Sequence, residues 1–220
     1  GFDWSLILGP RPADEGLRML DELAVSRPPG SADLGRAVLL AMLGRSDEAW
    51  PLAEARSDHL REVGGGWWVG EEYLAVIAMI EGDRQRACRH HTELIDAAPA
   101  GSDGVAASYR LILARDLCYL GRLEEAEPLL RQAQAVPADS VERSLAPCVE
   151  ALLLAGQGEL KEAEALARVG VAAAETETDN LWLQWWGYED LATVLERVGR
   201  SDEAREALER ALALSEQKRC

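Results

Sequence analysis

The stretch Leu191–Leu214, LATVLERVGRSDEAREALERALAL, decides the fold predicted for this chain. At its centre is Gly199-Arg-Ser-Asp-Glu-Ala204, with apolar residues at helical spacing on both sides. Glycine ends a helix because it adopts a left-handed backbone at little cost, and carboxylates just after it favour the positive end of the next helix dipole. We expect Ser201 to cap that next helix. The stretch therefore predicts two antiparallel helices joined by a tight turn.

The same pattern recurs along the 220 residues. Its glycines lie at positions 44, 82, 121, 158 and 199, at intervals of 38, 39, 37 and 41 residues. Self-similarity at such a period is typical of stacked helix hairpins. The alanine that closes each copy lets two helix backbones approach closely, and Ser46 has the same predicted capping role as Ser201. The further copies are Gly44–Ala49, Gly82–Ala87, Gly121–Ala126 and Gly158–Ala163, with a degenerate copy at Arg11–Gly16.

Between these turns the apolar residues keep a helical spacing, and no segment alternates with the period of two that a half-buried strand requires. The sequence therefore predicts an all-α chain that folds as a right-handed α–α superhelix. Prolines at 28, 99 and 137 lie where a helix must stop. We expect about eleven helices, over residues 13–25, 31–43, 47–62, 67–81, 84–97, 103–120, 123–135, 140–156, 160–175, 180–198 and 202–217.

This pattern resembles the tetratricopeptide repeat (TPR), and the resemblance covers essentially the whole chain. The units here are 37–41 residues long, against about 34 in that family, and Leu or Ala often replaces its aromatic residues. The resemblance implies a single TPR-like solenoid over residues 1–220, with a partial repeat at 1–29 and repeats at about 30–66, 67–105, 106–142, 143–180 and 181–220. The residues that carry it most clearly are Tyr188, Leu191, Ala192, Leu195, Gly199, Ala204, Leu208 and Ala211.

A second resemblance concerns the C-terminal stretches Asp190–Ala204 and Ala211–Lys218. They are similar to the tail of actinobacterial regulators that join a class III nucleotide-cyclase-like domain, an AAA/STAND-type ATPase and a helical array. This implies a fragment of a longer bacterial protein, serving as the non-catalytic interaction or sensor array of a cytoplasmic signalling or transcriptional regulator. Any ATPase or cyclase activity would lie in an upstream domain. The alternative is a free-standing TPR scaffold or adaptor without a sensor role.

The binding surface of a TPR array is its concave face, which the first helix of each pair forms. We expect a protein or peptide segment, an effector, or the rest of the same polypeptide to bind there by apolar burial. Two interpretations stay open: an open groove, or tighter curvature that buries the same residues in a core. The clamp of cationic residues found in co-chaperone arrays is absent. The predicted partner-binding residues are Leu34, Val38, Met42, Glu72, Val76, Met79, Leu111, Arg115, Tyr119, Leu145, Cys148, Leu152, Trp186 and Glu189.

The composition excludes several function classes. Asp and Glu number 39 against 23 Lys and Arg, for a formal net charge of −16, so we expect no direct nucleic-acid partner. No uncharged stretch approaches the roughly 20 residues that span a bilayer, so we expect no membrane partner. No signal-type apolar run opens the chain and the cysteines suggest no disulfide framework, so we expect a cytoplasmic location. The four cysteines, Cys88, Cys118, Cys148 and Cys220, form no C-x-x-C pair and are expected to be buried free thiols.

The sequence predicts no catalytic, metal or cofactor site. Its three histidines provide no Ser-His-Asp or Cys-His set. His90 and His91 point about 100° apart on a helix, so they cannot share a metal ion. The glycine-rich stretch Gly64–Gly70 lacks the Lys-Ser/Thr of a phosphate loop.

The ends of the array are the last notable feature. The final predicted helix presents Leu208 and Leu212 with no further repeat to cover them. Terminal repeats normally need a polar outer face or a cap. We therefore expect at least one end to dock on another copy, as a homodimer, or on the rest of the protein.

Overall fold

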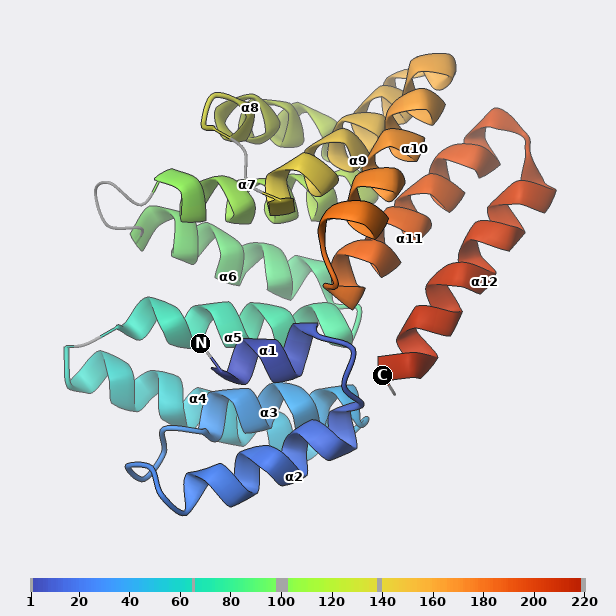
Figure 1. The fold of residues 1–220 in the computed structure, drawn as a ribbon. Helices are drawn as coiled ribbons and strands as arrows, with labels where there is room; N and C mark the ends of the chain where they lie inside the picture. Colours follow the sequence, from blue (N-terminus) through green and yellow to red (C-terminus); the bar gives the residue numbers. More distant parts are fainter. Residues whose placement is uncertain (1, 65, 98–102, 138–139, 219–220) are drawn as a thin grey trace. The chain divides into compact units, whose positions relative to one another are not determined.

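The computed structural model describes residues 2–64, 66–97, 103–137 and 140–218. These residues form twelve helices and no strand, and the helices pack pairwise as antiparallel hairpins (Figure 1). The predicted all-α, TPR-like fold class is therefore confirmed. The helices are α1 (Phe2–Leu8), α2 (Ala13–Ala24), α3 (Asp33–Met42), α4 (Ser46–Glu62), α5 (Trp67–Ile80), α6 (Arg84–Ala97), α7 (Asp103–Tyr119), α8 (Leu123–Gln134), α9 (Ser140–Gln157), α10 (Leu160–Glu177), α11 (Leu181–Val198) and α12 (Ser201–Lys218).

Each of the eleven predicted helices coincides with one helix of the structure, with ends that differ by at most two residues. The prediction missed α1, a helix of only seven residues that lies outside the repeated turns. Helix α1 packs on α2 and α3, and its Ile7 is fully buried. Helix α1 therefore supplies a packing partner for α2, the first of the predicted helices.

The five repeated glycines have the predicted left-handed backbone. Their φ angles are 71°, 74°, 74°, 93° and 86° at Gly44, Gly82, Gly121, Gly158 and Gly199. In each turn the N–H of the next residue donates to the carbonyl five residues earlier, at 2.9 Å, as in a Schellman motif. These bonds are Arg45 to Leu40, Asp83 to Ala78, Arg122 to Leu117, Glu159 to Leu154 and Arg200 to Leu195.

The predicted capping roles of Ser46 and Ser201 are wrong, because these serines are already the first residues of α4 and α12. The Schellman turn is so short that the residue straight after the glycine takes the capping position. Arg45 occupies it before α4 and makes no side-chain cap. Its guanidinium instead binds Glu48 through two bonds of 2.7 Å, and Arg122 binds Glu125 in the same way.

The chain divides into two compact units. The first contains α1–α6 and the chain end from Glu216 onward. In it, α3 packs on α4 and α5, and α5 packs on α6. Val38, Leu39 and Ile77 are fully buried in its core. Lys218 is also buried here, and its ammonium donates to the carbonyls of Leu6, of Gly9 at 3.0 Å and of Arg11 at 2.8 Å.

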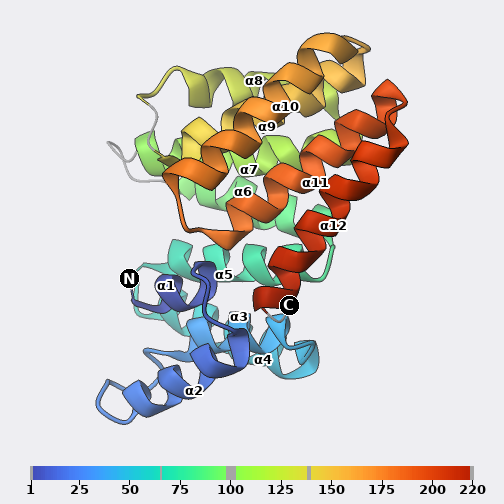
Figure 2. The same ribbon diagram turned by 45° about the vertical axis from the view of Figure 1, so that its right-hand side comes forward.

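The second unit contains α7–α11 and most of α12. Helix α9 contacts α7, α8, α10 and α11, and Figure 2 shows α9 and α10 lying side by side. Gly170 permits this close approach, because a Cβ at that position would lie 2.2 Å from Cys148 Sγ. Leu111, Val149 and Val194 are fully buried in the core.

Candidate functional site

The predicted partner-binding residues lie on the first helices of the hairpins, α3, α5, α7, α9 and α11. Most of them are buried, and the others are half-buried. Their partner-binding role remains a prediction. The buried residues are Leu34, Val38, Met42, Val76, Leu111, Arg115, Leu145, Cys148, Leu152 and Trp186, and the half-buried residues are Glu72, Met79, Tyr119 and Glu189.

In the second unit, a buried ion pair joins α7 to α11. Arg115 is 2% exposed and Asp190 is fully buried. Arg115 Nε donates to both Asp190 carboxylate oxygens at 3.0 Å, and Arg115 Nη2 lies 2.8 Å from Asp190 Oδ1. The two residues are 75 positions apart in the sequence. The pair therefore connects the first helices of two hairpins that both pack on α9.

Three other predicted partner-binding residues join this network. Tyr119 donates its hydroxyl to Asp190 Oδ1 at 2.6 Å, and Arg115 Nη2 donates to Glu189 Oε2 at 2.9 Å. The Arg115 guanidinium lies 5.0 Å from the ring centres of Tyr119 and Trp186, within the range of a cation–π contact. Arg115, Tyr119, Trp186 and Glu189 are thus engaged with one another and with Asp190.

The charges of this network follow from its geometry. All these contacts to Asp190 come from donors, which is the environment of an ionised carboxylate. Burial raises the pKa of Asp190, and the charge of Arg115 offsets part of that rise. Burial lowers the pKa of Arg115, but the Asp190 carboxylate outweighs it and holds that pKa well above its usual value. Removal of either residue would therefore leave the other charge buried without a partner, which destabilises the folded protein.

This network bears on the two interpretations of the first-helix face. A ligand in the second unit would have to compete with contacts that Arg115 already makes within the protein. The observed burial and pairing favour the core interpretation for this unit. Asp190 was not among the predicted residues. Its signal in the sequence is a carboxylate beside apolar Leu191 and Ala192 on an amphipathic helix, and this does not reveal a partner 75 residues away.

The first unit also contains a buried carboxylate, Glu71 on α5, which is 1% exposed. His90 Nδ1 lies 2.7 Å from its Oε2, and Ser57 donates its hydroxyl to Oε1 at 3.5 Å. Arg61, which is 44% exposed, forms an ion pair with the same carboxylate. Burial raises the pKa of Glu71, but the hydrogen bond with His90 and the charge of Arg61 outweigh it and lower that pKa overall. This carboxylate braces α5 against its sequence neighbours α4 and α6.

The predicted residues of the first unit include one that lines a cavity. Leu34, on α3, lies at a hollow of about 280 Å³ that α4 and α5 also border. On α5, Val76 is 9% exposed, and Glu72 and Met79 on the same helix face are half-buried. The Arg115 network likewise contains two half-buried residues, Tyr119 and Glu189, but these are engaged with Asp190 and Arg115.

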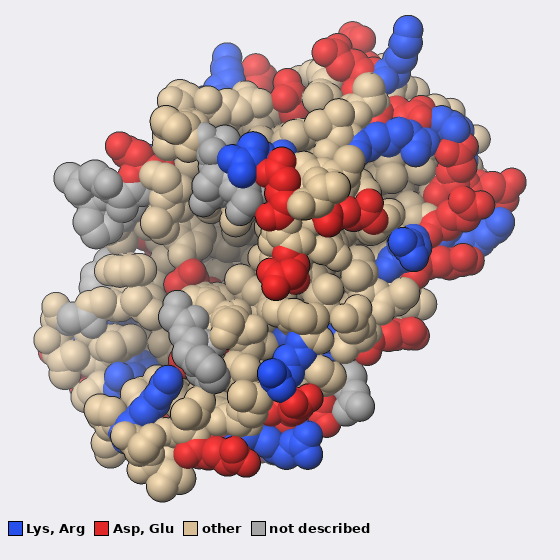
Figure 3. Space-filling view, viewed as in Figure 1, with Lys and Arg blue, Asp and Glu red and all other residues tan. Residues whose placement is uncertain are grey.

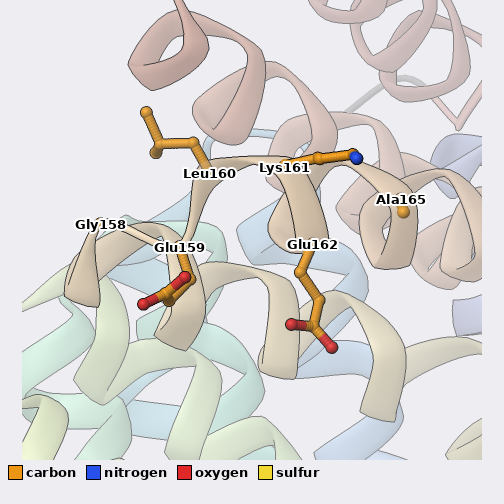
Figure 4. A pocket seen from close by; sticks show the side chains of 6 residues that line it. All are labelled: Gly158, Glu159, Leu160, Lys161, Glu162 and Ala165. Carbon is orange, nitrogen blue, oxygen red and sulfur yellow. The ribbon is translucent and has the colours of Figure 1, made fainter.

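A second hollow, of about 590 Å³, lies at the start of α10 in the second unit. Its lining comes from one turn and the helix that follows it. In Figure 4, the side chains of Leu160, Lys161 and Glu162 point in different directions and do not converge on a point. The arrangement has no buried apolar wall to hold a ligand. The complete lining is Gly158, Glu159, Leu160, Lys161, Glu162 and Ala165.

The histidines and the surface charges are the remaining candidates for a site. No three His, Cys, Asp or Glu side chains of the described residues gather closely enough to hold a metal ion. Burial, and then the neighbouring His90, lowers the pKa of His91 to about 3, so His91 is neutral at ordinary pH. On the face shown in Figure 3, basic and acidic side chains are interspersed. Among the residues described, no helix is long and apolar enough to span a membrane.

Two further predictions concern the cysteines and the last helix. Cys88, Cys118 and Cys148 are buried free thiols, as predicted, whereas Cys220 lies outside the described residues. Leu208 and Leu212 of α12 are 50% and 58% exposed, so the prediction of an uncovered apolar pair is confirmed.

Comparison with known families agrees with this fold. One tetratricopeptide-repeat model matches residues 30–55, 148–168 and 185–210, and a second matches residues 106–135. The four matched segments lie in both units and include four of the five repeated glycine turns. No curated protein matches the chain significantly.

Similar solved structures also have TPR-like folds. One is a crystal structure of nearly identical TPR-like repeats of a kinesin light chain from Podosopora anserina. It has a TM-score of 0.54 and 21% identity, over 83% of this chain and 93% of that one. The crystal structure of BtubC (BKLC) from P. vanneervenii has a TM-score of 0.57 and 17% identity, over 92% of this chain and 87% of that one. At such identities the likeness concerns the fold alone.

Proposed function

We propose that this TPR-like array is a non-catalytic protein-interaction scaffold whose partner, a protein or peptide segment, binds the first-helix face of the first unit. The observation that carries the proposal is that the half-buried Tyr119 and Glu189 of the second unit are engaged by Asp190 and Arg115, whereas the half-buried Met79 of the first unit presents an apolar side chain. Glu72, Val76 and Met79 form one side of α5, on which Glu72 and Met79 are half-buried and Val76 is buried. An apolar segment laid on this face would bury Met79 and Val76, in the way that amphipathic helices occupy grooves.

The remaining predicted residues have supporting roles in this proposal. Val38 and Met42 lie beneath the surface and hold α3 in place. In the second unit, Leu111, Leu145, Cys148 and Leu152 belong to the core. The Arg115 network joins α7 to α11 within that unit. A location in the cytoplasm belongs to the same proposal.

A photo-crosslinking residue in place of Met79 tests the binding face in cells. The matched control carries the same residue in place of Val25, which is 90% exposed at the end of α2 in the same unit. We expect Met79 to capture a defined protein that Val25 does not. Purified, that protein should bind the wild type, and Met79→Arg should weaken binding at least tenfold while Val25→Arg has no effect. Equal capture at both positions would contradict the proposed face.

A second candidate function is the sensor arm of a larger bacterial signalling regulator, associated with a STAND ATPase or a cyclase-like domain. It is favoured by the resemblance of Asp190–Ala204 and Ala211–Lys218 to the tails of such proteins. In this case, binding at the first unit shifts the array between two conformations and thereby changes an upstream activity. The gene upstream of Gly1 tests the idea: a nucleotide-binding P-loop supports it, and a start codon directly before Gly1 contradicts it.

A further inference from the structure

The cavity of about 280 Å³ in the first unit has a mixed lining. Leu34, Leu60 and Val69 supply apolar side chains, and Arg56 and Tyr73 supply polar groups. These residues come from α3, α4 and α5. The volume lies at or just below the lower end of the range for small-molecule sites, so it suits a compact ligand. A few polar groups beside an apolar wall are the usual means of fixing the orientation of such a ligand.

Arg56 supplies a positive charge to the lining of the cavity. Among the described residues it makes no ion pair and no side-chain hydrogen bond. A Cβ built on Gly30 would lie 3.2 Å from Arg56 Nη1, and also 3.2 Å from Asp33 Oδ2, which forms no ion pair with Arg56. Gly30 has a φ of 77°, a conformation that favours glycine. The turn at Gly30 therefore leaves room for the guanidinium at the cavity.

Tyr73 supplies a hydroxyl to the lining of the cavity. The residue is 5% exposed, and its ring packs against Trp4 with the ring centres 4.7 Å apart. Its hydroxyl makes no hydrogen bond within the described part of the chain, and the oxygen is accessible at the cavity although the residue as a whole is buried. Burial, and then the charge of Asp3, raises the pKa of Tyr73. The phenol is therefore protonated at neutral pH and can donate a hydrogen bond to a ligand.

Of the charged groups that line the cavity, Arg56 is cationic and Asp3 is anionic, and the Asp3 carboxylate is paired with Arg27 at 3.3 Å. The Asp33 carboxylate also lies near Arg56. The hydroxyl of Ser31 adds a further donor that has no partner among the described residues. Arg56, Tyr73 and Ser31 together offer donors to one ligand, and an arginine fork matches a carboxylate in geometry and charge.

We propose that this cavity binds a small amphipathic carboxylate. Its carboxylate accepts hydrogen bonds from Arg56 and Tyr73, and its short apolar chain lies on Leu34, Leu60 and Val69. Such a carboxylate has two sources, a free short-chain acid or the apolar C-terminal residue of a peptide. The inference goes beyond the proposed partner-binding face, because Glu72 and Met79 do not line the cavity.

Isothermal titration calorimetry of the whole chain with sodium hexanoate and with hexanamide tests the proposal. The two probes share an apolar chain and differ in the charge that Arg56 is inferred to bind. We expect hexanoate to bind and hexanamide to bind roughly ten- to a hundredfold more weakly, the usual range for a hydrogen bond to a charged group. N-acetylleucine and its amide repeat the comparison for a peptide C-terminus, so the preferred acid identifies the source.

Three variants make the test specific. Arg56→Met should lose the preference for the acid, and Tyr73→Phe should weaken hexanoate binding by a smaller factor. Arg18→Met is the matched control: it removes an exposed arginine of the same unit that does not line the cavity, and it should bind like the wild type. Circular dichroism shows whether each variant is folded. Equal binding of acid and amide, absence of binding to both acids, or wild-type binding by folded Arg56→Met would overturn the proposal.

Discussion

Two buried carboxylates, Asp190 in the second unit and Glu71 in the first, lie on first helices of hairpins but are held in different ways. Asp190 binds Arg115, which is itself buried and 75 residues away in the sequence. Glu71 binds Arg61 and His90, which lie 10 and 19 residues away and are partly exposed. Asp190 therefore joins distant hairpins of its unit, whereas Glu71 braces neighbouring helices.

The difference shows what a long-range ion pair does to a repeat array. Contacts between adjacent helices alone leave a first-helix face accessible, because each hairpin touches only its neighbours. The Arg115–Asp190 pair adds a contact between hairpins that are not sequence neighbours, and it occupies the side chains that a partner would otherwise meet. Water screens Arg61, the cation paired with Glu71, but it does not reach Arg115. Loss of the cation should therefore cost more unfolding free energy at Asp190 than at Glu71.

The largest expected effect comes from Arg115→Met. It leaves the Asp190 carboxylate fully buried without its cation, which costs about 3–5 kcal/mol of unfolding free energy. Urea denaturation followed by circular dichroism measures the loss. The matched control is Arg205→Met, which removes an arginine that is 65% exposed and paired with an exposed Asp202. We expect no measurable change there.

The double variant Arg115→Met with Asp190→Leu separates the pair from the packing around it. Replacing both charges with apolar side chains removes the unpaired carboxylate, so most of the lost stability should return. If the double variant is as unstable as Arg115→Met, the loss arises from packing, and the comparison with Glu71 no longer holds.

We expect a smaller loss of unfolding free energy from Gly70→Ala. This substitution disturbs the crossing of α4 and α5 beside Glu71. The added Cβ would lie 2.3 Å from Ser57 Oγ and 2.9 Å from Ser57 Cα, so the two helices must move apart. Overpacking of this kind costs roughly 1–3 kcal/mol. The control, Gly104→Ala in α7, meets nothing within 4 Å and should be neutral or slightly stabilising. Similar thermal unfolding of the two variants would show that the crossing is not tight.

Glu71→Gln should cost roughly 1–2 kcal/mol near neutral pH, because it replaces a charged acceptor by a neutral one. The folded state lowers the pKa of Glu71 below its ordinary value of 4.5, so the stability it supplies is present above that value and is lost as the pH falls through the folded pKa. The difference between wild type and variant, measured by denaturation between about pH 6 and pH 3, should therefore shrink on acidification.

Asp190 should give the opposite pH dependence of stability when the same denaturation experiment is carried out. Its folded pKa is raised from 3.8, so the folded state holds the proton more tightly than the unfolded state. The associated stability is present below the unfolded pKa and is lost as the pH rises through the folded pKa. Asp190→Asn should remove this slope. Identical pH profiles for Glu71→Gln and Asp190→Asn would contradict the contrast between the two sites.

The fold was predictable because its signals are local. Each hairpin turn needs a left-handed residue, and Gly44, Gly121 and Gly199 mark such turns in the sequence. Helix α1 was missed because seven residues carry too little periodicity and no turn motif precedes them. The capping error at Ser46 arose because the sequence does not reveal that the helix begins one residue early.

The candidate site was less predictable because its contacts are not local. Periodicity placed Arg115, Tyr119 and Trp186 on first helices, but it could not pair Arg115 with Asp190, since the curvature that brings them together is a property of the packed unit. The cavity at Leu34 depends on the positive φ at Gly30 and on the position of Arg56 beside it. Neither feature follows from the spacing of apolar residues.

The helices at the two ends of the chain give a last comparison, and the smallest expected effect on stability. Helix α1 buries Leu6 and Ile7, whereas α12 leaves Leu208 and Leu212 exposed. Because both leucines are already in contact with water, Leu208→Gln with Leu212→Gln should change the unfolding free energy by less than about 0.5 kcal/mol.

The same change removes an apolar face that another copy of the chain could cover, so it should abolish any self-association. Light scattering across a concentration series measures this. The control, Glu206→Gln with Glu209→Gln on the same helix, should self-associate like the wild type. A monomeric wild type at high concentration would show that α12 is not a dimer contact.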